Sequence, residues 1–274
     1  MLSTKRFDAN KNYPLIGPED PPPVEVLNPE SDSKVLLVCD HASRSFPAAM
    51  NKLGLDDLAL DRHIAWDIGA GAVTRLLAAR FDATAVLAGY SRLIVDYNRK
   101  LDDPTAFPEI SDGIMVPGNQ GLSKEARIAR VISFYEPYHE AISAEIEAAL
   151  SSGVYPAIVS IHSFTPMFAG RARHWKIGVL WDKDPRIPTP LIGGMRKRVG
   201  DDCVGDNEPY SGRDPHDFTV DNHAETRGLP NVSIEIRQDL IDSDEGVTEW
   251  AGHLGDVLAP ILADPDLYQI LEME

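Results

Sequence analysis

The chain has 274 residues, and its 26 lysines and arginines against 43 aspartates and glutamates give a formal net charge of −17. Hydrophobic residues make up 43% and charged residues 25% of the chain, which is ordinary for a globular protein and excludes a disordered, collagen-like or coiled-coil chain. The negative charge argues against nucleic acid or an anionic membrane surface as the main partner, and no apolar run reaches the roughly 18–20 residues of a membrane helix. A small anionic substrate stays compatible with this charge, because a local arginine cluster outweighs a distant field within about 8–10 Å.

Residues 1–33 are rich in Pro, Asp, Glu and Asn, and they predict an extended arm because three consecutive prolines cannot lie inside a helix. After the arm, short apolar runs alternate with helical spacing, so we expect one catalytic α/β domain over residues 34–274. The predicted strands are 35–39, 85–88, 93–95, 157–161, 177–181 and 232–236. The predicted helices are 61–80, 123–150 with a kink at Pro137, 191–199 and 248–262, with long irregular segments at 100–122 and 205–231. The continuous apolar strands are typical of a largely parallel sheet buried on both faces.

The two cysteines, Cys39 and Cys203, are too few for a disulfide scaffold. The first residues, MLSTKRFDANKNYPLIG, contain no apolar core followed by a cleavage site of small residues. We therefore expect a cytoplasmic protein with reduced thiols, in which Cys39 is a buried apolar residue rather than a nucleophile. A homo-oligomer is left open, because such assemblies are common among soluble enzymes.

Polar residues stand at the ends of the predicted strands, which is where ligands bind in open α/β sheets. These residues are Asp40 and His41 after VLLVC, 96–99 (DYNR) after LIV, His162 and Ser163 after AIVSI, and Glu235 inside VSIEI. Glu235 is the most informative, because a buried carboxylate without a partner is costly. It has either an ion pair with Arg237 or Arg92, or a catalytic or metal-binding role. The pattern predicts one site at one edge of the sheet.

A metal site is the functional reading of the histidines. His63 and Asp67 are four residues apart and would share a face of the predicted helix, so one of them is the candidate third ligand beside His41 and His162. Two histidines and a carboxylate with an open fourth position form a catalytic zinc set. The alternative is that His63 and Asp67 belong to a solvated first turn, where the helix dipole favours an acidic residue.

Arginines near the same edge are candidates for binding an anion, because a guanidinium matches a carboxylate. We assign this role to Arg99 with Asn98, add Arg237 as a further substrate-binding candidate, and treat Arg92 as a candidate for stabilising an oxyanion. The alternative for any single arginine is a surface position. The nucleophile elbow GxSxG, the dinucleotide motif GxGxxG and the P-loop motif are absent.

Taken in order, six segments of the chain resemble the N-formylglutamate amidohydrolase family, and the resemblance spans roughly residues 35–245. The segments are VCDHASRSFP, RHIAWDIGA, YSRLIVDYNR, PYH, SIHSFTP and HAETRGLPNVSIEIRQDLI. The family hydrolyses the N-acyl amide of an acidic amino acid in histidine degradation. Its fold is similar to zinc carboxypeptidases and succinylglutamate desuccinylases. This implies a phosphorylase/hydrolase-like α/β/α domain of three layers with a mixed, mostly parallel sheet.

Residue by residue, the resemblance implies that His41 and His162 are the metal histidines and Glu235 the general base. Asn98 and Arg99 match the pair that binds the substrate carboxylate in related deacylases. The relatives have a metal carboxylate three residues after the first histidine, where this chain has Arg44. The resemblance therefore leaves Asp67 or His63 as third ligand, and we prefer Asp67 because a carboxylate then replaces a carboxylate.

These features together predict a zinc-dependent amidohydrolase that cleaves the formyl-type N-acyl amide of an acidic amino acid such as N-formylglutamate. Two alternatives remain. The missing carboxylate at Arg44 is compatible with a small-molecule binding protein that has lost the chemistry. The long segments 100–122 and 205–231 are compatible with a hydrolase of another N-acyl or peptide amide.

Overall fold

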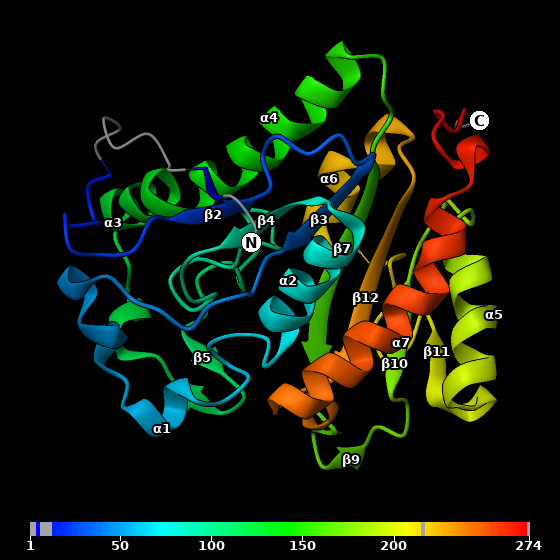
Figure 1. Ribbon diagram of the computed structural model, residues 1–274. Helices are drawn as coiled ribbons and strands as arrows, with labels where there is room; N and C mark the ends of the chain where they lie inside the picture. The colour runs from blue at the N-terminus through cyan, green and yellow to red at the C-terminus, as the bar shows by residue number, and fades with distance from the viewer. Residues whose placement is uncertain (1–3, 6–12, 215–216, 273–274) are drawn as a thin grey trace.

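The computed structural model describes residues 4–5, 13–214 and 217–272, and an eight-stranded mixed sheet forms its centre (Figure 1). The strand order is β1-β2-β4-β3-β7-β12-β10-β11. The four middle strands β4, β3, β7 and β12 are mutually parallel, whereas β2 and β10 are antiparallel to their neighbours in this group. Helices cover both faces, so the predicted three-layer α/β/α fold with a mixed, mostly parallel sheet is confirmed.

The strands of the sheet are β1 (Thr4–Lys5), β2 (Val24–Leu27), β3 (Val35–Cys39), β4 (Thr84–Ala88), β7 (Ala157–Phe164), β10 (Ile177–Leu180), β11 (Val204–Asp206) and β12 (Asn231–Arg237). Two small hairpins are β5 (Ile110–Ser111) with β6 (Ile114–Met115), and β8 (Met167–Phe168) with β9 (Arg171–Ala172). The α-helices are α1 (Asp57–Leu60), α2 (Ala70–Phe81), α3 (Lys124–Arg130), α4 (Glu136–Ser151), α5 (Pro188–Val199), α6 (Phe218–His223) and α7 (Asp244–Leu262).

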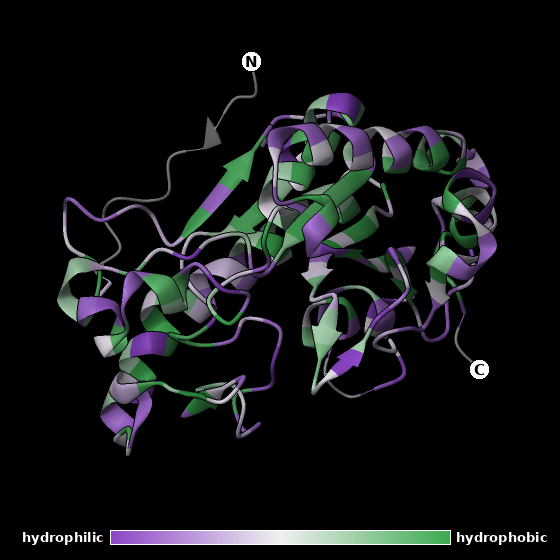
Figure 2. Cartoon of the chain, turned by 90° about the horizontal axis from the view of Figure 1, so that it is seen from below, coloured by the Kyte–Doolittle hydropathy of each residue, from purple (hydrophilic) through white to green (hydrophobic). Residues whose placement is uncertain are grey.

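Two hydrophobic cores lie on the two faces of the sheet. Leu37, Cys39 and Leu87 point into the core beneath α2, α5 and α7. Leu36 and Val86, which alternate with them, point into the core beneath α4. All residues of β3, β4, β7 and β10 are buried, and Figure 2 shows these central strands as mainly hydrophobic. Both faces are therefore used for packing, which leaves the carboxyl edge of the sheet for chemistry.

The N-terminal arm is partly incorporated into the sheet. The predicted arm over 1–33 includes residues outside the described ranges, but β2 lies within them and pairs antiparallel with β4. Val24 and Val26 are buried there, although the prolines before them gave no strand signal. The division into an arm and one domain stays a prediction.

Near the site, one predicted strand is wrong and one predicted helix starts too early. The run 93–95 forms turns, because side chains bind its carbonyls: Asn119 donates to Leu93 O and Arg130 donates to Ile94 O. The helix predicted over 61–80 begins only at Ala70. Residues 61–69 form turns instead, and Gly69 at their end has a φ of 79°.

The long helix predicted over 123–150 is present with an interruption. Ser123 caps its start, since the Ser123 side chain accepts a hydrogen bond from Ala126 N. A π-helical segment, Val131–Tyr135, separates α3 from α4. Pro137 has no N–H to donate one turn back, and the wider π turn directly before it accommodates this loss at the predicted kink.

The segments predicted as irregular contain short elements. The β5–β6 hairpin lies within 100–122, α6 lies within 205–231, and β11 extends into that second segment from Val204. Among the described residues, no helix has both the length and the apolar character that crossing a membrane requires.

Candidate active site

The carboxyl ends of β3, β7 and β12 bring the predicted residues together. His41 follows β3 by two residues, His162 lies in β7, and Glu235 lies in β12. In the parallel ladder Glu235 is paired with His162, so their side chains leave the same face of the sheet side by side. The segment 96–99 reaches the same place through turns after β4. All of these residues except Asp96 and Tyr97 line one pocket.

Asp67 completes a buried group with the two histidines. Its Oδ2 lies 2.9 Å from His162 Nδ1 and 3.4 Å from His41 Nδ1. The potential ligand atoms of the three residues lie within 4.8 Å of one another. Ligands around a tetrahedral zinc are about 3.3 Å apart for bonds of about 2.0–2.1 Å. The spacing therefore fits a divalent metal ion of this size.

The turn over 61–69 positions Asp67. Asp67 N donates to His41 O at 2.9 Å, which ties the turn to the end of β3. Ser163 N donates to Asp67 Oδ2 at 3.2 Å, and Ser163 Oγ donates to Ile68 O at 2.9 Å. The carboxylate is thus held against β3 and β7 at once.

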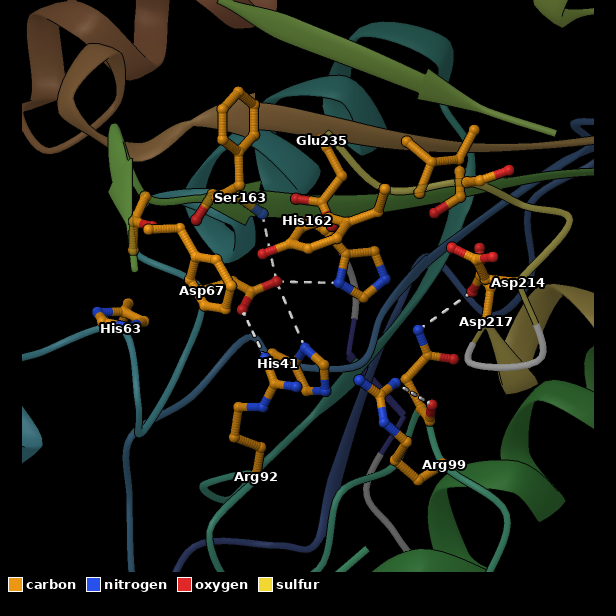
Figure 3. A pocket seen from close by; sticks show the side chains of 18 residues that line it. His41, His63, Asp67, Arg92, Arg99, His162, Ser163, Asp214, Asp217 and Glu235 are labelled. Atoms are coloured by element: carbon orange, nitrogen blue, oxygen red, sulfur yellow. Dashed lines mark hydrogen bonds and ion pairs between the residues drawn. The ribbon is translucent and has the colours of Figure 1, made fainter. Parts of the chain in front are cut away.

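Further carboxylates contact the outer nitrogens of both histidines. Asp96 Oδ1 lies 2.8 Å from His41 Nε2, and Asp40 Oδ2 lies 3.0 Å from His162 Nε2. Carboxylates in this position fix the ring orientation of metal-binding histidines and increase their basicity. Both Nδ1 atoms are left directed toward Asp67 (Figure 3).

The charges of this cluster favour a divalent cation. Asp40, Asp67 and Asp96 contribute three negative charges, and Arg92 contributes one positive charge by contacting Asp67 Oδ1 at 3.3 Å and Asp96 Oδ2 at 2.6 Å. With neutral imidazoles, two negative charges remain. Burial alone lowers the pKa of His162, but the close carboxylates of Asp40 and Asp67 reverse this and raise the pKa well above its usual value. The residues thus fit a site that attracts positive charge.

Glu235 is buried without an ion pair to either arginine considered in the sequence. It is 8% exposed, and its Oε2 has no hydrogen-bond partner within the described part of the chain. Arg237 instead binds Asp239, and Arg92 binds Asp67 and Asp96. Burial, with a smaller contribution from the charge of Asp67, raises the pKa of Glu235 to about 7, although His162 opposes the shift. A carboxyl group with such a pKa is suited to exchange protons near neutral pH.

The pocket around these groups has a volume of about 370 Å³. At one end, Asn98 donates from Nδ2 to Asp217 Oδ1 at 3.1 Å and accepts from Thr219 N at 2.8 Å. Arg99 lies on the same side as Asp217 (Figure 3). These contacts fix the amide of Asn98 beside a guanidinium at the pocket wall.

Three residues from the sequence argument lie outside the metal group. His63 lines the pocket, but its Nε2 lies 3.7 Å from Asp112, and it is not part of the group formed by Asp67. Arg237 is not among the pocket residues, because Asp239 and the carbonyls of residues 173–175 bind its guanidinium. Arg44 pairs with Asp61 at the surface.

Cys39 is fully buried, which raises the pKa of its thiol to about 12 and confirms its apolar role.

Sequence reasoning gave no role to several residues of the site. Asp40 and Asp96 stand directly at the quoted strand ends, so their position was a usable signal for carboxylates behind the histidines. Asp217 and Tyr210 lie in the segment 205–231, which has no periodic pattern. Only the fold brings that segment over the carboxyl edge.

Comparison with known proteins identifies related sequences and folds. Residues 33–242 match the sequence profile of the N-formylglutamate amidohydrolase (FGase) family. The crystal structure of gene product Atu2144 from Agrobacterium tumefaciens is 38% identical, with a TM-score of 0.86 over 91% of this chain and 98% of that one. N-formylglutamate amidohydrolase from Ralstonia eutropha JMP134 is 18% identical, with a TM-score of 0.66 over 88% of this chain and 97% of that one, and it supports the fold. No curated protein sequence matches the chain.

Proposed function

The chain belongs to the N-formylglutamate amidohydrolase family, whose members are hydrolases of linear amides, and we propose that it is a zinc-dependent amidohydrolase of N-acyl amino acids. One observation carries the proposal: the buried group His41–Asp67–His162 has Glu235 beside it in the same pocket. The family is named after N-formylglutamate, an acidic amino acid whose amine carries a formyl group. We therefore take N-formylglutamate as the reference substrate.

His41, Asp67 and His162 would hold the metal ion. Bound zinc in such a set lowers the pKa of water to about 7 and polarises a carbonyl group. Asp40 and Asp96 keep the two rings oriented, and Arg92 keeps Asp67 and Asp96 in place. The guanidinium of Arg92 also lines the pocket, where its positive charge is available to stabilise the developing oxyanion.

Glu235 would act as general base and then as general acid. It accepts a proton from the attacking water, whose oxygen joins the acyl carbon. The amide C–N bond then breaks, and Glu235 returns the proton to the leaving amine. The raised pKa of Glu235, about 7, suits both steps, because the group is easily charged and easily protonated near neutral pH.

Asn98 and Arg99 would bind the carboxylate of the amino acid. The side-chain contacts of Asn98 to Asp217 and Thr219 fix the amide in one orientation, and Arg99 contributes the positive charge beside it. The alternative of a binding protein without catalysis was based on the sequence, which has Arg44 where the relatives have a metal-binding carboxylate. Asp67 supplies a carboxylate to the histidines from another segment, so the geometry favours the hydrolase.

The variant Glu235→Gln tests this function. We expect at least a 100-fold loss of kcat, since general acid–base catalysis contributes about 10²–10⁴-fold, while the zinc content stays unchanged. Glu147→Gln is the matched control, because Glu147 is exposed, pairs with Arg227 and is not among the pocket residues. Activity of Glu235→Gln within threefold of the wild type contradicts the assigned role.

A further inference from the structure

Aromatic side chains form the mouth of the pocket. Phe164 follows His162 by two residues on the same face of β7, so it lies beyond the metal group toward the carboxyl edge. Phe168 in the β8–β9 hairpin and Tyr210 line the same pocket and are 52% and 41% exposed. These three rings, Phe164, Phe168 and Tyr210, are called the aromatic rim.

The opposite end of the pocket has buried polar side chains. Ser233 precedes Glu235 by two residues on the same face of β12, and it is 2% exposed. Asn98 and Asp217 are each 7% exposed and lie at this end with Ser233. Along the strand direction, the row of Glu235 and His162 therefore separates a polar floor from the aromatic rim.

Arg173 holds the rim together. Its guanidinium carbon lies 4.6 Å from the ring centre of Phe168, 4.8 Å from that of Tyr210 and 5.7 Å from that of Phe164. It also contacts Thr165 Oγ1 at 3.4 Å. Arg173 itself is not among the residues that line the pocket. Its guanidinium interacts with the ring faces through cation–π contacts, so the three rings together form one apolar surface on the pocket side.

This arrangement bears on the acyl group of the substrate, and the argument depends on the function proposed above. A carboxylate bound at Asn98 and Arg99 places the amine side of the amide at the floor. Cleavage beside Glu235 then directs the substituent of the acyl carbon toward the rim. A formyl group has only a hydrogen there and leaves the rings uncovered, whereas exposed apolar rings at a pocket mouth are typical of a binding surface.

We propose that the aromatic rim is an acyl subsite, and that the preferred substrates are N-acyl amino acids with an apolar, arylacyl-type group rather than a formyl group. Aromatic rings of substrate and rim pack edge to face or offset, which adds affinity beyond the area buried. Phe168 contributes most, because it is the most exposed ring of the rim.

The test compares kcat/KM of the zinc-loaded protein for N-phenylacetylglutamate, N-formylglutamate and N-succinylglutamate. We expect a preference of about tenfold for the phenylacetyl compound, of the size that one aromatic contact and its buried area supply. Phe168→Ala should remove most of this preference, because it should lower kcat/KM for the phenylacetyl compound several-fold more than for the formyl compound. Met115→Ala is the control, since Met115 is 60% exposed outside this pocket.

Three results overturn the subsite. The formyl compound is cleaved as well as the phenylacetyl compound, or Phe168→Ala lowers both equally. The third result is a preference for N-succinylglutamate. It would mean that the charge of Arg173, and not the aromatic rings, binds the acyl group at the pocket mouth.

Binding to zinc-loaded Glu235→Gln, measured by calorimetry, separates this inference from the proposed function. In one outcome, the phenylacetyl compound binds more tightly than the formyl compound, Phe168→Ala abolishes this difference, and the wild type turns over neither compound. This outcome supports the subsite and refutes the hydrolase. Turnover without any preference in rate or binding supports the hydrolase and refutes the subsite.

Discussion

Replacing Gly69 by alanine tests how the chain delivers Asp67 to the metal group. Gly69 precedes α2 and has a φ of 79°, a conformation that favours glycine. A Cβ atom at this position would lie 2.1 Å from Ile241 O and 2.8 Å from Ile241 Cγ1. The first of these neighbours is backbone, so the turn that contains Asp67 has to move.

The cost of Gly69→Ala has two parts. The left-handed backbone costs roughly 1–2 kcal/mol for a residue with a Cβ, and the steric overlap adds about 1–3 kcal/mol, as overpacking does elsewhere. We therefore expect a loss of about 2–5 kcal/mol in the free energy of unfolding. Because the shift reaches Asp67, we also expect zinc affinity to fall by about tenfold or more, which corresponds to about 1.4 kcal/mol.

Gly153→Ala is the matched control. Gly153 has a φ of 77°, and a Cβ there meets no atom within 4 Å, so only the backbone cost of roughly 1–2 kcal/mol applies. Urea unfolding and competition with a zinc-binding dye measure both variants. If the two variants lose the same stability and bind zinc equally, the steric argument about Asp67 is refuted.

Three further predictions concern the surroundings of the site. Asp96→Asn should weaken zinc binding by about 10–100-fold, as loss of a carboxylate behind a metal-binding histidine does, and an unchanged dye titration contradicts this. Arg237→Gln should leave kcat/KM within twofold, because Arg237 binds Asp239 outside the pocket, and a tenfold rise in KM would restore it as a substrate residue. Burial lowers the pKa of His139 to about 4, below the usual value of about 6.5. Between these two pH values the unfolded chain binds a proton that the folded chain does not, so the free energy of unfolding falls as the pH drops from 7 to 5. Urea unfolding of His139→Gln should show a fall smaller by about 2 kcal/mol, and an identical fall in both proteins contradicts the assignment.

The chemistry of the strand ends was predictable from the sequence. VLLVC, AIVSI and VSIEI are continuous apolar runs, so their burial and parallel pairing followed from composition. The polar residues directly after or inside them, His41, His162 and Glu235, then had to meet at one edge. The order of these motifs also sufficed to indicate the family.

Turns and long-range contacts are the features of the site that could not be predicted from the sequence. Asp67 was placed on a helix, because Ile64, Ile68 and Val73 have helical spacing, whereas Gly69 and the bond from Asp67 N to His41 O form a turn. Leu93 to Val95 has a strand-like composition, but side chains from distant segments satisfy its carbonyls. Such contacts have no local signature, so the turn that carries Asp67 could not be assigned from the pattern alone. Asp40 and Asp96, in contrast, stand directly after apolar runs, where the sequence does carry a signal.

The central claim is a metal ion held by His41, Asp67 and His162, and the zinc content of the purified protein tests it most directly. Mass spectrometry after zinc loading should give about one zinc per chain for the wild type and for the control His253→Ala, whose histidine contacts Arg198 and Glu249 at the surface. The double variant His41→Ala with His162→Ala should retain almost none. Wild-type protein that takes up no zinc, or a double variant that retains as much as the wild type, contradicts the account.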